Sequence, residues 1–278
     1  MKQVFKLIVV ALIFALGTGG AWAGEDLDRV MKNKVLKSAT SANWAPQSFM
    51  NDNNEWDGFD IDVTREIAKR LGVKAEFVTP AWDIMTAGNW HGRWDISVGS
   101  MTPTKARSKK LSFPGIYYYI PAGFAVHKKS PYKNKSELNG KKIGTTTASV
   151  YELFLKKDLT IDAEGAPSFE YDVATTAKNI RSYKDSNTAM DDLRLGDGVR
   201  LDAVISGFPT VQTAIDNGYP LRIIGNPSFY EPLSVAIDKG DKELQYMIAG
   251  IVKEMHEDGT LTALSMKWYK MDYTKVAK

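Results

Sequence analysis

The stretch VGSMTPTKARSKKLSF, residues 98–113, joins the apolar end of a strand to small hydroxyl side chains and one arginine. Thr102 followed by Pro103 is a common start for a helix. The free backbone N–H groups of a helix start attract anions, and the planar guanidinium of Arg107 can bind a carboxylate in two places. We therefore expect a helix from Pro103 and a carboxylate held beside it. The alternative is that Thr102 only caps the helix and Arg107 lies in solvent.

Strand-like and helix-like segments alternate along the rest of the chain. Strands are predicted at 35–40, 74–79 and 94–100, with an amphipathic helix over 61–72 that ends at Gly72 and a short helix before the third strand. A strand is also predicted at 122–128. A second series then begins, with predicted strands at 141–147, 201–207 and 221–225 and helices at 149–157, 187–196 and 210–218. A strand at 233–239 and two helices over 241–269 follow. Two such series predict an α/β protein of two lobes with mainly parallel sheet.

Ligands of such sheets bind beyond the carboxyl ends of the strands. The strand ends of interest are Ser100, the segment 145–149 and the segment 206–208. Trp44 and Trp82 lie just past predicted strands in loops that contain proline, where an aromatic ring can cover a small ligand by stacking or cation–π contact. The alternative for each tryptophan is a place in the core.

The first 23 residues have the pattern of a secretory signal peptide. Lys2 and Lys6 precede the apolar run LIVVALIFALG at 7–17, and AWA at 21–23 is a small-x-small cleavage signal. A buried helix or a membrane anchor is the alternative, but the run is shorter than the roughly 20 residues of a membrane span. We expect a periplasmic protein cleaved after Ala23.

The net charge limits the kinds of molecule that the chain is expected to bind, and the cysteine content limits its chemistry. The formal net charge of the chain is +3, and removal of Lys2 and Lys6 makes it +3 − 2 = +1. A nearly neutral protein is a poor candidate for binding nucleic acid. The chain has no cysteine, so a hydrophobic core alone must stabilise it and thiolate chemistry is excluded.

No metal or cofactor is predicted. His91, His127 and His256 have no metal-ligand spacing, and no phosphate-binding or dinucleotide-binding motif occurs. The segment 51–60 is loosely similar to a calcium loop, but Thr64 stands where a calcium loop needs a glutamate. We interpret this segment as a turn before a helix.

The order of these segments resembles the extracellular solute-binding proteins of family 3, the periplasmic receptors of polar amino-acid ABC importers. The resemblance is carried by DGFDIDVTREIAKRLG at 57–72, by 94–113 and by KKIGTTTASVYE at 141–152, and it covers essentially the whole mature chain. It implies a type II periplasmic-binding-protein fold, with two crossover hinge strands and a ligand cleft between the lobes. The implied lobes are 24–121 with 234–278 for lobe 1, and 122–233 for lobe 2.

The resemblance also implies site residues. Arg107 matches the arginine that binds the α-carboxylate of the ligand. Ser100 and Thr102 match residues that bind the same carboxylate through backbone and hydroxyl groups. Trp82 and Trp44 match aromatic residues on opposite walls of the pocket. The remaining predicted ligand-binding residues are Ser41, Thr147, Ser149, Gly207, Phe208 and Tyr117.

Some of these positions depart from the family pattern. Ser41 stands where many members have an acid, and Ser149 matches a threonine that follows glycine, although Ala148 precedes it here. Five residues after Asp202, where the family usually has an aspartate for the ligand ammonium, the chain has Gly207. Burial of an ammonium group without a counter-charge is costly.

These departures leave the ligand open. A carboxylate without an ammonium group fits better than an ordinary α-amino acid, as does a ligand whose cation lies between Trp44 and Trp82. Alternatively, an acid from elsewhere in the chain reaches the ligand, the candidates being Asp185, Glu152 and Glu231.

The predicted function is that of a monomeric binding protein that takes up a small carboxylate by closure of its lobes and delivers it to an ABC permease. An enzyme similar to the periplasmic cyclohexadienyl dehydratases is the alternative, and it would need a general acid in the cleft. Gly207 removes the obvious candidate for that acid. A sensory module that acts through a partner is a third possibility.

Overall fold

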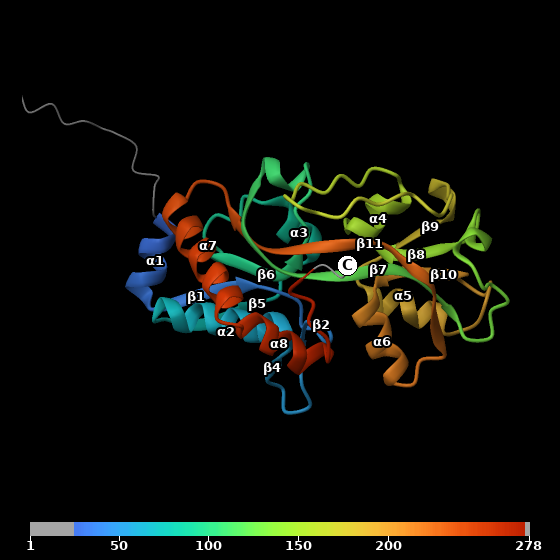
Figure 1. The fold of residues 1–278 in the computed structure, drawn as a ribbon, viewed down its shortest axis with the longest axis horizontal. Coiled ribbons are helices and arrows are strands. Elements are labelled where there is room, and N and C mark those ends of the chain that lie inside the picture. The colour runs from blue at the N-terminus through green and yellow to red at the C-terminus, as the bar shows by residue number, and fades with distance from the viewer. Residues whose placement is uncertain (1–24, 276–278) are drawn as a thin grey trace, which may run out of the picture.

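The computed structural model describes residues 25–275. It contains an eight-stranded curled sheet in the order β5-β1-β6-β11-β7-β10-β8-β9 and a three-stranded sheet in the order β2-β3-β4 (Figure 1). The strands are β1 (Val35–Ala39), β2 (Asn43–Trp44), β3 (Ser48–Met50), β4 (Trp56–Asp57), β5 (Lys74–Val78), β6 (Ile96–Met101), β7 (Leu111–His127), β8 (Ile143–Thr146), β9 (Ile180–Tyr183), β10 (Ala203–Gly207) and β11 (Leu221–Asp238). The α-helices are α1 (Glu25–Asn33), α2 (Phe59–Leu71), α3 (Trp82–Ala87), α4 (Val150–Leu155), α5 (Ser186–Leu193), α6 (Phe208–Asp216), α7 (Lys242–Glu257) and α8 (Thr260–Tyr269), and the 3-10 helices are η1 (Arg107–Lys109), η2 (Lys135–Leu138) and η3 (Ala177–Asn179).

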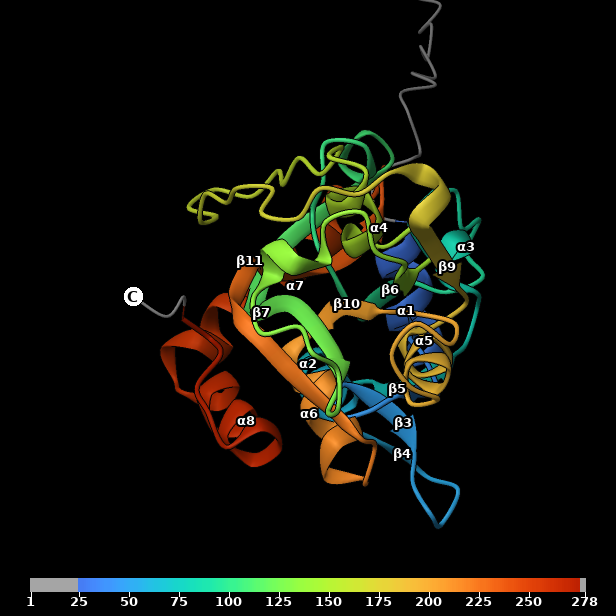
Figure 2. The same ribbon diagram turned by 90° about the vertical axis from the view of Figure 1, so that its right-hand side faces the viewer.

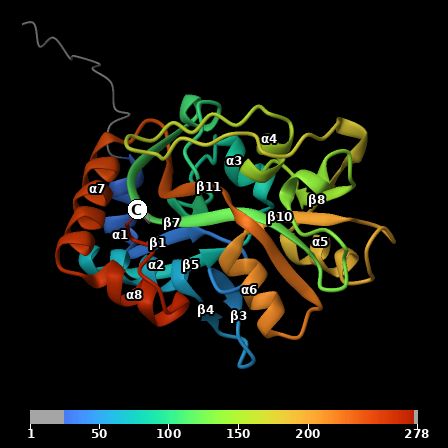
Figure 3. The ribbon, with the colours of Figure 1, turned by 45° about the vertical axis from the view of Figure 1, so that its right-hand side comes forward.

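Two long strands, β7 and β11, connect the two ends of the molecule. They pair antiparallel from Leu111 opposite Asp238 to His127 opposite Leu221, and they run side by side through the centre (Figure 2). On one side, β6, β1 and β5 are mutually parallel, and on the other side β10, β8 and β9 are mutually parallel. Figure 3 shows α7 and α8 at one end, and α5 and α6 at the other. The two-lobed α/β fold is therefore confirmed, with an antiparallel pair at its centre.

The hydrophobic cores follow the same division. Along β7, Ile120 packs in a cluster with α2, α7 and α8, whereas Ala122 belongs to a second cluster around α4. Along β11, Phe229 lies in the second cluster and Leu233 lies in the first. The core therefore changes between Ile120 and Ala122 on β7 and between Phe229 and Leu233 on β11. The lobe boundaries at 121/122 and 233/234 stay a prediction.

The sequence of helix α2 accounts for its buried face and for the residue at which it ends. Its buried face includes Phe59 and Ile67, which recur at helical spacing. Gly72 follows the helix with a φ of 70°, and its N–H donates to the carbonyl of Lys69. A left-handed residue at this position favours glycine, so the predicted end of the helix is confirmed.

Several strands were not predicted. The part of β7 before Ala122 contains Pro114, Gly115 and Pro121, which weaken the strand pattern. Shifts in the β7–β11 register, including one between Leu233 and Ser234, accommodate this irregular stretch. The segments predicted as separate strands at 221–225 and 233–239 are both parts of β11, and the short strands β2, β3, β4 and β9 carry too few residues for a clear alternation.

The predicted signal peptide lies outside the described residues, so it stays a prediction. Among the helices of residues 25–275, none is long and apolar enough to cross a membrane. The same part of the chain contains no group of histidine, aspartate and glutamate side chains arranged to hold a metal ion.

Candidate functional site

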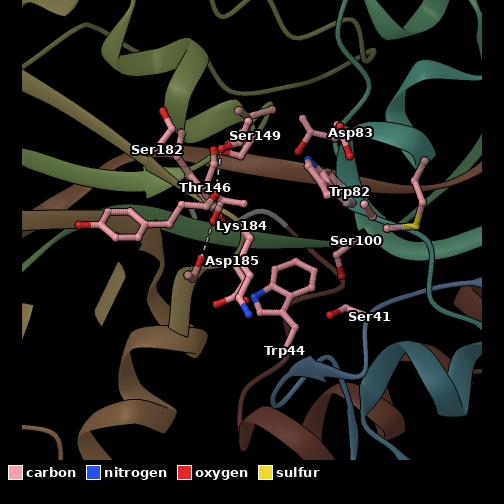
Figure 4. Close-up of a pocket in the computed structure, with 18 of the residues that line it drawn as sticks. Ser41, Trp44, Trp82, Asp83, Ser100, Thr146, Ser149, Ser182, Lys184 and Asp185 are labelled. Carbon is pink, nitrogen blue, oxygen red and sulfur yellow. Dashed lines mark hydrogen bonds between the residues drawn. The ribbon is translucent and has the colours of Figure 1, made fainter. Parts of the chain in front are cut away.

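A cavity of about 550 Å³ lies beside the crossover strands, with walls from both halves of the molecule. Figure 4 shows Trp82 entering it from α3 and Trp44 from β2, with Thr146 and Ser149 on the other half. Most of the predicted ligand-binding residues line this cavity, namely Ser41, Trp44, Trp82, Ser100, Thr102, Arg107, Thr147 and Ser149. The carboxyl ends of β6 and β8 meet here, as expected for a sheet of this type.

Arg107 is a buried cation on the cavity wall, with 6% of its surface exposed. Its Nη1 donates to the carbonyl of Thr102 at 2.9 Å and its Nη2 to the carbonyl of Ala148 at 3.0 Å. These bonds use two of its five N–H donors. Its Cζ lies 5.2 Å from the centre of the Trp82 ring. Burial lowers the pKa of Arg107 to about 10, so the group stays charged near neutral pH and can bind a carboxylate.

The expected helix at Pro103 is wrong. The chain forms only the 3-10 helix η1, which starts at Arg107, and Thr104 rather than Thr102 supports the turn, because its Oγ1 accepts from the Arg107 N–H at 3.2 Å. Thr104 also forms a β-bridge with Ile161 of the other half. This bridge keeps the residues after Thr102 extended, so no free helix amides face the cavity there.

Ser100 is fixed by a buried network below the cavity wall. It has a φ of 51°, its Oγ donates to Asp60 Oδ2 at 2.7 Å, and its N–H donates to the Tyr117 hydroxyl at 3.0 Å. The Tyr117 hydroxyl in turn donates to Asp60 Oδ1 at 2.8 Å. Tyr117 therefore does not line the cavity, and it supports Ser100 from behind. Burial raises the pKa of Asp60 to about 7.

This shift predicts a pH effect on stability. The native pKa of Asp60 lies above its value in the unfolded chain, so the native state binds the extra proton between about pH 4 and pH 7. The contribution of this group to the free energy of unfolding must therefore fall by about 1 kcal/mol per pH unit as the pH rises through that window. We expect Asp60→Asn to flatten this part of the profile, measured as the difference between wild type and variant in urea unfolding at pH 4.5, 6 and 7.5. Parallel profiles for the two proteins would contradict the assignment.

Gly207 and Phe208 lie outside the cavity lining. A Cβ atom at Gly207 would be 3.1 Å from the Tyr151 hydroxyl and 2.7 Å from Ile120 Cδ1. The Phe208 ring instead packs on Gly123, where a Cβ atom would be 2.7 Å from Phe208 Cε1. The side chain of Tyr151 therefore occupies the space above Gly207 and lines the cavity itself.

The residues that follow β8 include the N-terminal cap of helix α4. Ser149 Oγ accepts from the Glu152 N–H at 3.2 Å, which caps α4, and donates to the carbonyl of Thr146 at 2.6 Å. Thr147 Oγ1 donates to the carbonyl of Tyr183 at 3.0 Å. Both residues line the cavity with these hydroxyls already bonded.

The segment 182–186, which spans the end of β9 and the residues after it, also lines the cavity. These residues, except for Asp185, were not predicted from the sequence. Lys184 and Asp185 lie near Trp44 in Figure 4, and Ser182 and Ser186 complete this wall. The loop carried no strong pattern, because β9 is a short and partly exposed strand. Asp185 Oδ1 accepts from the Thr188 N–H at 2.7 Å and so caps α5.

Glu231 on β11 is the buried acid of the cavity. Only 3% of its surface is exposed, and its Oε2 accepts from Thr102 Oγ1 at 3.1 Å. Its Oε1 has no hydrogen-bond partner within the described residues. Burial raises the pKa of Glu231 to about 7, against the opposing effects of Tyr151, Thr102 and Arg107. The enclosed Nε1 of Trp44, also on the cavity wall, likewise has no partner within residues 25–275.

Several contacts cross the cleft beside the cavity. Ala148 of the second half accepts from Arg107 and also from Trp82 Nε1 at 3.3 Å. Asn187 Nδ2 of α5 donates to the backbone carbonyl of Asn43 at 3.1 Å. These bonds join the two halves around the cavity.

Comparison with known proteins gives consistent matches. A family model described as bacterial extracellular solute-binding proteins, family 3, matches residues 36–271. The L-cystine-binding protein TcyJ of Escherichia coli K12 is 28% identical over 99% of this chain and 97% of its own length. A probable amino-acid ABC transporter-binding protein of Haemophilus influenzae is 30% identical over 91% of each chain.

Solved structures agree with the fold. A crystal structure of an ancestral amino acid-binding protein, described as a precursor of cyclohexadienyl dehydratase, has a TM-score of 0.73 and 30% identity over 87% of this chain and 99% of its own. An ancestral arginine-binding protein bound to arginine has a TM-score of 0.72 and 28% identity over 85% of this chain and 98% of its own. These similarities extend across both halves of the molecule.

Proposed function

Because the chain belongs to the bacterial extracellular solute-binding proteins, family 3, we propose that its solute carries a carboxylate and is bound by Arg107. It is a solute-binding protein of the kind that serves amino-acid ABC transporters. The observation that carries the proposal is the position of Arg107, which is buried on the cavity wall and bonded to carbonyl groups instead of to an acid. Three of its N–H donors have no hydrogen bond within residues 25–275 and can meet a carboxylate.

Ligand binding and lobe closure are coupled through the same residue. Arg107 belongs to one half and donates to Ala148 of the other. A carboxylate that orders this guanidinium adds contacts that exist only when the lobes meet. Such a ligand shifts the protein toward the closed form in proportion to its preference for that form.

The remaining features of the proposal rest on the sequence pattern of the first 23 residues and on the role of the relatives in ABC transport. The mature protein is a periplasmic monomer, its leader is removed after Ala23, and the closed form docks on a permease of an ABC importer. The chain acts by binding and not by catalysis, as its curated relatives are binding proteins.

A thermal-shift screen tests this proposal. The probes are the twenty standard L-amino acids, L-cystine and a set of small mono- and dicarboxylates. We expect at least one of them to raise the melting temperature, because a ligand at a hundred times its Kd adds about 2.7 kcal/mol of stability. Neutral sugars are the control and should give no shift. Binding only of sugars, or conversion of prephenate or arogenate to an aromatic product, would contradict the proposal.

A further inference from the structure

We propose that Glu231 binds the ammonium group of the ligand, so that the ligand is an α-amino acid held between Arg107 and Glu231. This inference rests on the proposed function, since it takes the carboxylate on Arg107 as given. It selects one of the possibilities that the sequence left open, namely that an acid from elsewhere replaces the usual aspartate.

Three acids line the cavity, and two of them are already engaged. Asp83 Oδ1 accepts from the Ile84 N–H at 3.0 Å, and Asp185 caps α5 through Thr188. Glu231 is the most deeply buried of the three, and its Oε1 has no partner in the described part of the chain. A buried carboxylate oxygen without a donor is unfavourable. A cationic donor from the ligand would satisfy it.

The positions of the two charged groups suit an α-amino acid. Thr102 links them, because its Oγ1 donates to Glu231 Oε2 at 3.1 Å and its carbonyl accepts from Arg107 Nη1 at 2.9 Å. Within residues 25–275, Arg107 and Glu231 do not form an ion pair with each other. Each is instead hydrogen-bonded to Thr102, so both charged groups remain available to a ligand. In an α-amino acid, the carboxylate and the ammonium are attached to one carbon atom, so they need an anion site and a cation site that are close neighbours.

The same arrangement explains Gly207. A side chain at Gly207 would meet the Tyr151 hydroxyl, which stands above this glycine. Tyr151 and Glu231 both line the cavity. The acid has therefore been supplied by β11 instead of by the end of β10, and Tyr151 fills the space that an aspartate at Gly207 would need.

The groups that face Glu231 predict how the affinity for the ligand depends on pH. Arg107 of η1, Tyr151 of α4 and Thr102 at the end of β6 surround it, and its pKa is raised to about 7 by burial. An ammonium group binds only to the ionised carboxyl, so affinity for an α-amino acid must fall as the pH drops below about 7. The α-carboxylate and α-ammonium of such a ligand do not titrate between pH 5.5 and pH 8.

The experiment is calorimetric titration of wild type, Glu231→Gln and Glu170→Gln. The probes are the twenty L-amino acids and L-cystine, together with the carboxylic acids that have the same side chains but lack the α-amino group. We expect Glu231→Gln to bind amino acids about a hundredfold more weakly and to lose the decrease in affinity between pH 8 and pH 5.5. Glu170→Gln is the matched control and should keep the wild-type affinity, because Glu170 is exposed and lies outside the cavity lining.

The outcomes separate this inference from the proposed function. Equal affinity of Glu231→Gln and wild type, when Arg107→Ala no longer binds, overturns the role of Glu231 and leaves carboxylate binding intact. If wild type binds the carboxylic acids that lack the amino group as tightly as the amino acids, the role of Glu231 is also overturned and carboxylate binding is intact. If wild type binds no probe of either kind, the proposed function fails as well. If Glu231→Gln does not fold, the wild-type pH profile decides, since a constant affinity from pH 5.5 to pH 8 overturns the inference.

Discussion

Replacement of Arg107 by alanine is expected to weaken ligand binding by at least about a hundredfold, and by about a thousandfold for a ligand held by both charges. The guanidinium is buried, lines the cavity and meets carbonyl oxygens of both halves. Its removal deletes charge-assisted hydrogen bonds to the ligand and one bond that joins the lobes. The truncation also removes the positive charge that favours the ionised form of Glu231. Calorimetric titration with the best ligand of the screen measures the loss.

The matched control is Arg107→Lys. Lysine keeps the positive charge but lacks the planar fork, so we expect an affinity between those of wild type and the alanine variant. Unfolding by urea should show that both variants keep most of their stability, because Arg107 has no acidic partner within 4 Å among the described residues to be left unpaired. An alanine variant that binds as tightly as wild type would place the carboxylate elsewhere in the cavity.

Sequence patterns predicted Ser100, Thr102 and Arg107 together because one short stretch of the chain contains all three. Ser100 lies in the fully buried strand β6, Thr102 and Arg107 follow that strand, and all three line the cavity. The error at Pro103 has a tertiary cause, since the bridge from Thr104 to Ile161 holds that segment extended. Such a contact between distant residues leaves no mark on local periodicity.

Glu231 shows a different limit of prediction from sequence. The sequence placed it only among several acids, because nothing near it indicates that β11 crosses between the lobes with this side chain turned into the cavity. Its role depends on pairing with β7, where Glu231 lies opposite Ile120, and on Tyr151 over Gly207. A position defined by three segments that are far apart in the chain can be recognised only in the folded structure.

Replacement of Gly58 by alanine is expected to destabilise the protein by about 4 kcal/mol or more. Gly58 stands before α2 with a φ of 124°, and an added Cβ atom would lie 2.3 Å from the carbonyl oxygen of Gln47 and 2.7 Å from its carbonyl carbon. These are backbone atoms, which cannot rotate away. The same carbonyl accepts from the Asp60 N–H at 2.8 Å, so a shift of this loop also disturbs the acid that fixes Ser100.

The matched control for Gly58 is Gly72→Ala at the other end of the same helix. Gly72 also has a positive φ, of 70°, but an added Cβ atom there has nothing within 4 Å. Only the left-handed backbone then opposes alanine, with an expected loss of about 1–2 kcal/mol. Urea unfolding of both variants at the same pH separates the two effects. Similar losses would show that backbone conformation dominates at Gly58, whereas a much larger loss there would show that close approach to Gln47 requires the glycine.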